Sequence, residues 1–166
     1  SVQNELLWSN NRHCDAGYQF LGKNNWNLPE TGILPLLPNF TSFTNGLFIN
    51  AKNEFEHIST EFGARYDFTF RNVAMLTNTL PRTVVYYGDK YHNISALARV
   101  SGRISTQWTA MAEVAVRQRP PEINEMYAFG LHQGVSGIEE GSLELKQESG
   151  VKSTFQLSGQ FGQHLH

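Results

Sequence analysis

The sequence predicts an all-β protein, an antiparallel up-and-down meander of about seven long strands. The first observation is that apolar and polar side chains alternate in window after window. The second is composition: charged residues make up 17% of the 166 residues, against about 25% in a typical soluble domain. Asn, Gln, Ser and Thr together supply 46 residues, which suits strands with one wet face better than a helical bundle. The third is that short and long links alternate along the chain.

The first three expected strands lie near residues 2–9, 13–23 and 43–55. Apolar side chains recur there at intervals of two, as one face of a strand requires. The apolar side is formed by Val2, Leu6, Trp8, Cys14, Ala16, Tyr18, Phe20, Phe43, Leu47, Ile49 and Ala51. Mostly polar residues occupy the positions between them, so each strand is predicted to have one apolar and one polar face.

The alternation is clearest in the strands expected near residues 57–70, 91–104 and 106–118. The apolar side of these three strands includes Ile58, Phe62, Tyr66, Phe68, Phe70, Ile94, Val100, Trp108, Val114 and Val116. The opposite side carries the charged residues Glu61, Arg65, Asp67, Arg99, Arg103, Glu113 and Arg117. A last strand is expected near 150–163, with Val151, Phe155, Leu157 and Phe161 on one side.

The lengths of the links indicate the kind of sheet. The links near residues 10–11, 56–57 and 105 are a few residues long, whereas those near 24–42, 71–90 and 119–149 are long. A meander places all short links at one edge and all long links at the other, the arrangement of a transmembrane β-barrel. The expected strands also reach the roughly 9–11 residues needed to cross a bilayer, and aromatic residues crowd their ends, as interfacial girdles require.

One segment carries a more specific pattern. Residues 117–150 contain an Arg-x-Pro element, an Asn-Glu-x-Tyr turn, a Gly-x-His-x-Gly stretch and an acidic lead into a strand. The matching positions are Arg119, Pro120, Asn124, Glu125, Tyr127, Gly130, His132, Gly134, Glu140, Gly141, Leu145, Lys146, Glu148 and Ser149. This pattern resembles the late-barrel segment of TonB-dependent outer-membrane receptors. Residues 46–68 and the loop 33–40 also resemble that family, so the likeness covers most of the chain.

The resemblance implies a barrel of 22 strands, of which residues 1–166 are a partial β-barrel domain. The family's plug domain and its TonB-contacting segment have no counterpart in the sequence, and the last residues, QFGQHLH, lack the terminal aromatic expected of an outer-membrane protein. The chain therefore looks like an internal piece of such a receptor. The partners implied are the lipid bilayer, the rest of the barrel and the plug, and TonB through that plug.

The implied function is energised uptake of a scarce metal complex across the bacterial outer membrane, with an iron–siderophore first and zinc, haem or cobalamin as rivals within the class. Ligand contacts would come from the extracellular loops near 24–42, 71–90 and 119–149. Aromatic and Arg side chains suit large, flat, anionic chelates. The residues of these kinds are Trp26, Tyr86, Tyr87, Arg117, Arg119, Tyr127 and His132. Each also has a structural interpretation, in which it packs or pairs at the base of a loop.

Local chemistry in the last long loop predicts structure. Pro120 and Pro121 should end the preceding strand because neither has an N–H to donate to a ladder. Asn124, followed by Glu125 and Tyr127, is expected to open a short helical turn.

Other function classes lack support in the sequence. The near balance of 13 basic and 15 acidic residues gives no nucleic-acid footprint, and no motif of a known catalytic site is present. We therefore expect no enzyme, no cofactor and no metal site, although His92 or His132 in a zinc or haem site remains an alternative. No apolar run is long enough for a transmembrane helix, and no leader peptide is expected.

Two alternatives to a receptor stay open. One is a soluble up-and-down barrel that binds a small apolar ligand, and the other is an outer-membrane barrel with a structural or adhesive role. The direction of six side chains separates the membrane barrel from the soluble one, because they point to lipid in the first and to a packed interior in the second. These residues are Phe62, Tyr66, Trp108, Val114, Phe155 and Leu157.

Overall fold

The structure, a computed structural model, describes residues 2–9, 11–28, 35–77, 79–132 and 137–160, with residues 2–9 and 131–132 described by backbone alone. It is all-β, with 72% strand and 4% helix. A seven-stranded antiparallel sheet forms most of it, in the order β1-β2-β3-β4-β5-β6-β9. Its strands are β1 (Val2–Ser9), β2 (Arg12–Asn25), β3 (Asn39–Glu54), β4 (Ile58–Leu76), β5 (Val84–Arg103), β6 (Trp108–Arg119) and β9 (Glu148–Gly159).

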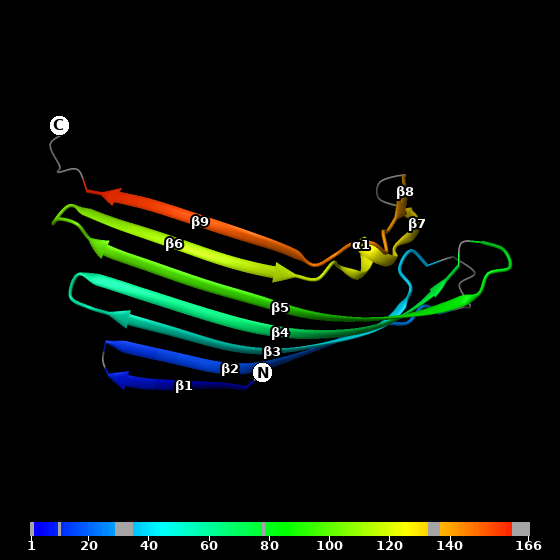
Figure 1. Cartoon of the computed structure of the whole chain (residues 1–166), viewed down its shortest axis with the longest axis horizontal. Coiled ribbons are helices and arrows are strands. Elements are labelled where there is room, and N and C mark those ends of the chain that lie inside the picture. The colour runs from blue at the N-terminus through cyan, green and yellow to red at the C-terminus, as the bar shows by residue number, and fades with distance from the viewer. Residues whose placement is uncertain (1, 10, 29–34, 78, 133–136, 161–166) are drawn as a thin grey trace.

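The expected up-and-down topology is confirmed. Strands β1 to β5 each pair with the next strand along the chain, and β9 joins the free side of β6 (Figure 1). Between β6 and β9 the chain forms a short helix, α1 (Ile123–Tyr127), and a small hairpin of β7 (Phe129–His132) and β8 (Gly137–Glu140). The short links at 55–57 and 104–107 lie at one end of the sheet and the long links at the other. The sheet is open, with β1 and β9 as its edges.

The prediction of a long loop at 71–90 is wrong. Strand β4 continues to Leu76 and β5 begins at Val84, so only residues 77–83 link them. The pairing of β4 with β5 runs without interruption to Leu76 opposite Val84. The alternation does not reveal this extension, because the otherwise polar face is apolar there, at Val73, Met75 and Tyr87. The two faces of the strands then no longer differ in polarity.

Other boundaries differ less. The first long link is 26–38 rather than 24–42, because β2 extends to Asn25 and β3 begins at Asn39. The segment 119–149 contains α1, β7 and β8, so much of it is regular structure. The expected helical turn is present, but it begins at Ile123 with Glu122 as the N-cap, so Asn124 lies inside it. The predicted end of the last strand, near residue 163, lies outside the described residues.

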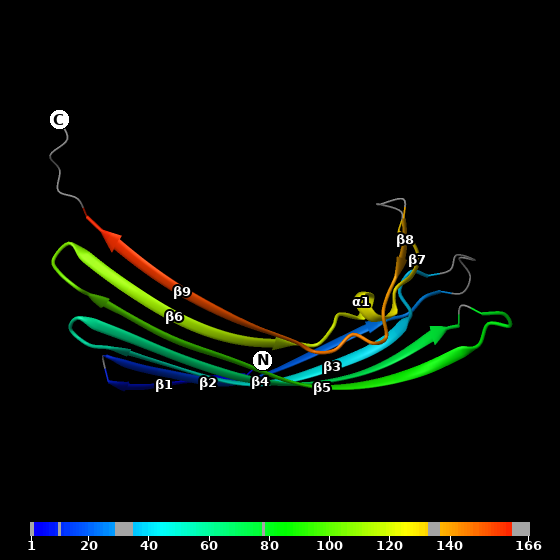
Figure 2. The same cartoon turned by 45° about the horizontal axis from the view of Figure 1, so that its top comes forward.

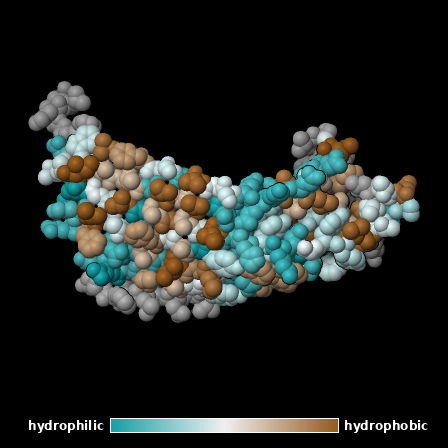
Figure 3. Space-filling model, in the orientation of Figure 1, coloured by the Kyte–Doolittle hydropathy of each residue, from teal (hydrophilic) through white to brown (hydrophobic). Residues whose placement is uncertain are grey.

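The two faces of the sheet differ in chemistry, and we name them by the side of the sheet to which each points. The outer face carries the apolar residues, which remain exposed: Phe155 is 76% exposed and Phe62 54%. The other exposed apolar side chains of this face include Tyr18, Phe20, Leu47, Ile49, Tyr66, Ile94, Val100, Val114, Val151 and Leu157. Figure 3 shows brown side chains gathered over the half of the sheet nearer the short turns. Of the six residues that separate a membrane barrel from a soluble one, five are exposed, and Trp108 is half-buried.

The inner face carries the polar residues, and these are the better covered ones. Thr69 and Asn93 are each 3% exposed, and Glu113 is 8% exposed. Burial therefore follows the two-residue period of the strands, but the apolar side is the exposed one. The strands bow along their length, and α1, β7 and β8 rise from the hollow side (Figure 2).

We expect the 166-residue chain to associate in buffer without detergent. The uncovered outer face and the two edge strands both favour contacts between copies. Size-exclusion chromatography with light scattering, run with and without a mild detergent, checks this expectation. Detergent should convert the associated material into a single species, whereas a stable monodisperse monomer in plain buffer would contradict it.

Candidate functional site

The candidate site lies on the inner face near the long links, where α1 packs on β4 and β5. Ile123, Met126 and Tyr127 of α1 are buried together with Val73 of β4. Phe40, Met75 and Tyr87 pack against this group from the sheet. We call these seven residues the rim cluster. A buried side chain of this size contributes about 1.5–3 kcal/mol relative to an exposed one, so the cluster is sufficient to hold a one-turn helix in place.

Local chemistry at the end of β6 brings α1 to this place. Pro120 and Pro121 follow the last residue of the strand and cannot continue its ladder. The backbone N–H of Glu122 then donates to the carboxylate of Glu125 at 2.7 Å, one half of a capping box. The backbone N–H of Ala128 closes the turn on the Asn124 carbonyl at 3.1 Å.

Two tyrosine hydroxyls join α1 to β5. The Tyr127 hydroxyl donates to a carboxylate oxygen of Asp89 at 2.5 Å, and the Tyr91 hydroxyl donates to the sulfur of Met126 at 3.3 Å. Tyr127 is 2% exposed. Burial, followed by the hydrogen bond and the negative charge of Asp89, raises the pKa of Tyr127 well above its usual value. Its hydroxyl therefore stays a proton donor throughout the physiological range.

Arg71 of β4 contacts the segment that leads into α1. Its Nη1 donates to the carbonyl oxygen of Pro121 at 2.5 Å, and its guanidinium carbon lies 5.1 Å from the centre of the Tyr91 ring. The side chain is buried, and its Nε has no hydrogen-bond partner.

Arg119 joins the start and the end of the segment 120–147, which links β6 to β9. Its guanidinium group donates to Glu148, the first residue of β9, at 2.9 Å and to Glu125 of α1 at 3.1 Å. The hydrogen bond from Arg119, and then the one from the Glu122 backbone, lower the pKa of Glu125. The carboxylate of Glu125 thus stays charged, and it accepts hydrogen bonds both from the first turn of α1 and from Arg119.

Gly141, which follows β8, passes directly over the backbone of α1. Its N–H donates to the Ala128 carbonyl at 2.7 Å, and the next N–H, of Ser142, donates to the Glu125 carbonyl at 2.9 Å. A Cβ at residue 141 would lie 2.5 Å from the carbonyl carbon of Met126. Only glycine allows this approach without a shift of backbone.

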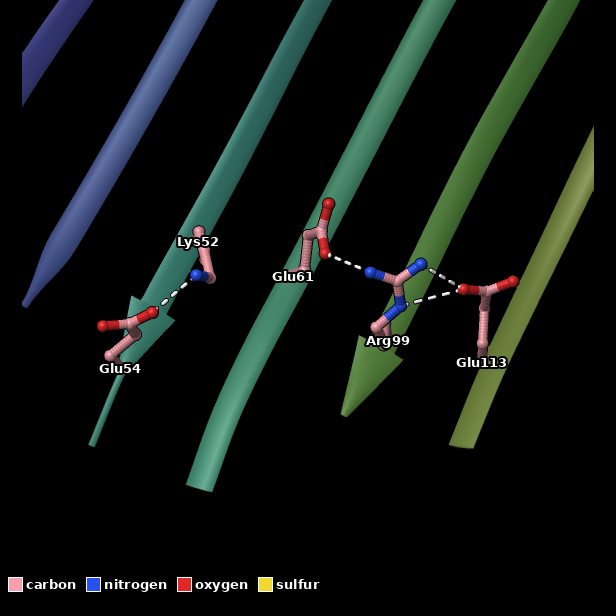
Figure 4. Close-up of polar contacts among 5 residues, drawn as sticks. All are labelled: Lys52, Glu54, Glu61, Arg99 and Glu113. Atoms are coloured by element: carbon pink, nitrogen blue, oxygen red, sulfur yellow. Dashed lines mark hydrogen bonds and ion pairs between the residues drawn. The ribbon is translucent and has the colours of Figure 1, made fainter. Parts of the chain in front are cut away.

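Nearer the short turns, the inner face carries ion pairs that cross several strands (Figure 4). Arg99 of β5 donates to Glu61 of β4 at 2.8 Å and to Glu113 of β6 at 2.5–2.8 Å. Lys52 and Glu54 form a pair at 2.5 Å within β3. In these contacts the charged side chains of this part of the inner face pair with one another.

The structure does not bring all the predicted contact residues together. Tyr87 and Tyr127 meet in the rim cluster, with ring centres 5.6 Å apart, and Arg119 clamps the same segment. Tyr86 is 79% exposed and lies on the opposite, outer face, while Trp26 is 72% exposed just beyond β2. The remaining two are Arg117, exposed on the inner face, and His132, which ends β7 and whose side chain lies outside the described residues.

Sequence reasoning missed Arg71, Asp89 and Tyr91. All three lie on the inner face within the segment that the sequence assigned to a loop or to the first residue of a strand. The signal that could have found them is the phase of the alternation: odd positions of β4 and β5 share one face, and these three residues continue that series.

Other site types find little support in the described part of the chain. It contains no group of three or more side chains suited to a metal ion, and none of its helices is long and apolar enough to cross a membrane. His92, considered for a metal, instead shares a hydrogen bond of 2.6 Å with the Tyr66 hydroxyl on the outer face. Comparisons with family models, curated proteins and solved structures return no match to this chain.

We expect Gly141→Ala to destabilise the rim cluster by about 1–3 kcal/mol, because the added Cβ must displace backbone of α1. Gly150→Ala is the matched control: a Cβ there has only the Arg117 carbonyl oxygen, at 4.0 Å, within reach. Denaturant unfolding of the chain in detergent, followed by tyrosine and tryptophan fluorescence, measures both variants. Equal effects of the two substitutions would refute the close approach at Gly141.

Proposed function

We propose that this chain is part of a transmembrane β-barrel receptor of the bacterial outer membrane, and that the whole receptor takes up a scarce metal complex, an iron–siderophore. In this proposal the seven strands belong to a barrel of 22, the outer face meets lipid, and the inner face lines the lumen beside a plug domain. TonB, acting through that plug, supplies the energy for uptake.

The observation that carries the proposal is the uncovered outer face. Large apolar side chains of six neighbouring strands, β2 to β6 and β9, lie exposed on one side of the sheet. Water-soluble proteins rarely expose apolar surface that is continuous over so many strands. In a bilayer the same side chains would be in their preferred solvent. The ladder would satisfy the backbone between the strands, and the proposed barrel would supply partners for the edge strands β1 and β9.

The length and curvature of the sheet agree with this proposal. Strands β4 and β5 have 19 and 20 residues, about twice what a tilted strand needs to cross a bilayer. On β4 the outer face is mostly apolar from Ile58 to Phe70. Asn72 and Lys90 interrupt it, and Leu76, Val84 and Tyr86 form a second exposed apolar group near the long links. The polar side, which carries α1, is the hollow side of the bowed sheet, as in a barrel with a wet lumen.

The alternatives can be weighed on the same observation. A soluble barrel with a small apolar ligand needs its apolar side chains on the hollow side, and there the described residues place ion pairs and buried polar groups. A structural or adhesive barrel needs the same two faces as a receptor. Only a measurement of uptake separates these two.

We expect an arginine on the outer face to oppose membrane folding strongly and one on the inner face to be tolerated. Val114→Arg places the charge on the outer face in mid-strand, at a position 50% exposed, with an expected cost of about 2–4 kcal/mol. Thr154→Arg is the matched control, because Thr154 lies opposite the inner-face residue Glu113 on the neighbouring strand. Urea titration of folding into phosphatidylcholine vesicles measures the difference, and equal tolerance of both substitutions would count against lipid contact.

Uptake tests the function itself. Deleting the gene for the whole protein in its own bacterium should abolish energy-dependent uptake of radioactive iron presented as a ferric siderophore. Uptake of unchelated ferrous iron should continue, and returning the gene on a plasmid should restore siderophore uptake. Unchanged uptake across a panel of hydroxamate and catecholate siderophores would contradict the proposed ligand. The arginine test described above concerns only whether the chain belongs to a membrane barrel.

A further inference from the structure

Arg71 and Asp89 are opposite charges that stand directly across from each other on β4 and β5. Directly opposite residues of an antiparallel pair have their Cβ atoms about 4.5–5.5 Å apart, close enough for an Arg–Asp pair. Yet each side chain bonds to the α1 segment instead. Asp89 accepts the hydroxyl proton of Tyr127, and Arg71 donates to the Pro121 carbonyl. We call residues 120–129 the strap.

The contacts of Arg71 with the strap compensate its charge poorly. The side chain is 5% exposed, its Nε has no partner, and it forms no ion pair with a carboxylate of the described residues. One carbonyl oxygen and the face of Tyr91 are its partners there. The Glu125 carboxylate of the strap interacts with Arg71 without direct contact, and Arg71 adds to the lowering of the Glu125 pKa by Arg119. Because a buried cation without a direct counter-ion is costly, the docked strap compensates the charge of Arg71 only in part.

We propose that docking of the strap is an exchange of partners between two states. With the strap docked, Tyr127 holds Asp89 and Pro121 holds Arg71. With the strap lifted, Asp89 and Arg71 pair with each other across β4 and β5. The new ion pair offsets part of what lifting loses, namely the bonds of Tyr127 and Arg71, the bond of Tyr91 to Met126 and the burial of the rim cluster. In this proposal the strap has two positions at the rim of the inner face, of which the docked one is favoured.

The position of the strap determines which side chains of β4 and β5 are exposed on the inner face. The docked strap buries Val73 and packs on Met75 and Tyr87 of the strands below it. Lifting the strap uncovers this apolar and aromatic floor while the ion pair beside it forms. Arg119 stays clamped to Glu148 at the two ends of the segment 120–147, so residues 120–129 move about that point. This inference does not depend on the ligand or on transport.

Hydrogen exchange of the strap tests the proposal. The amide of Phe129 donates to the Leu36 carbonyl, outside the strap, at 3.0 Å, so mass spectrometry of a peptide covering residues 122–129, in detergent, reports lifting. Tyr127→Phe releases Asp89 and should accelerate exchange about tenfold or more, the effect of losing a hydrogen bond to a charged acceptor. Exchange of a peptide from residues 58–66 of β4 should stay unchanged, which shows that the sheet remains folded.

The deciding comparison adds a change at Arg71 to Tyr127→Phe. Partner exchange predicts that Arg71→Met slows the strap again by about twofold to fivefold, the contribution of a cross-strand pair, and that Arg71→Lys, which keeps the charge, does not. Arg71→Gln serves as a second uncharged variant should Arg71→Met disturb the sheet. If the uncharged variants instead exchange faster than, or as fast as, Tyr127→Phe alone, Arg71 holds the strap down or is not coupled to Asp89, and the proposal is overturned.

Discussion

Each side chain of an antiparallel strand must point to one of two faces, and the rest of this structure depends on how the chain divides its residues between them. Phe62, Val114 and Phe155 point to a face that no part of the described chain covers, while Glu61 and Arg99 point to the face where α1 packs. Because β2 to β6 and β9 are paired in uninterrupted register, a slip of one residue would exchange the two faces. The register in which β4 pairs with β5 therefore also fixes which side chains point to the outer face and which to the inner face.

The inner face changes character along its length, and the rim cluster exists because of that change. From Glu61 to Arg71 the odd positions of β4 are mostly polar or charged, and at Val73 they become apolar. Hydrophobic packing on this face is consequently concentrated near the long links, where α1 provides the other half of the contact. Arg71 and Asp89 lie where the polar part of this face meets the apolar part, and their polar contacts determine how firmly α1 is held.

The sequence predicted the seven strands of the main sheet, their order and the chemistry of both faces, since all follow from a period of two, but not the β7–β8 hairpin. It failed at 71–90, where Val73, Met75 and Tyr87 interrupt the contrast between faces although the strands continue. Tyr86 and Tyr87 were both among the predicted ligand contacts, but neighbours in a strand point to opposite faces, and only Tyr87 reaches the rim cluster. The phase of the alternation could have placed Arg71 and Asp89 on the inner face, but their hydrogen-bond partners depend on tertiary packing, which composition does not reveal.

The central claim is that the outer face meets lipid. The most direct measurement is the accessibility of nitroxide spin labels placed one at a time at residues 94–100 of β5, in a Cys14→Ser chain reconstituted in phospholipid vesicles. The account predicts that labels at even positions collide with oxygen and are shielded from a water-soluble nickel chelate, and that labels at odd positions show the reverse. Equal accessibility at all positions, or the opposite phase, would contradict it.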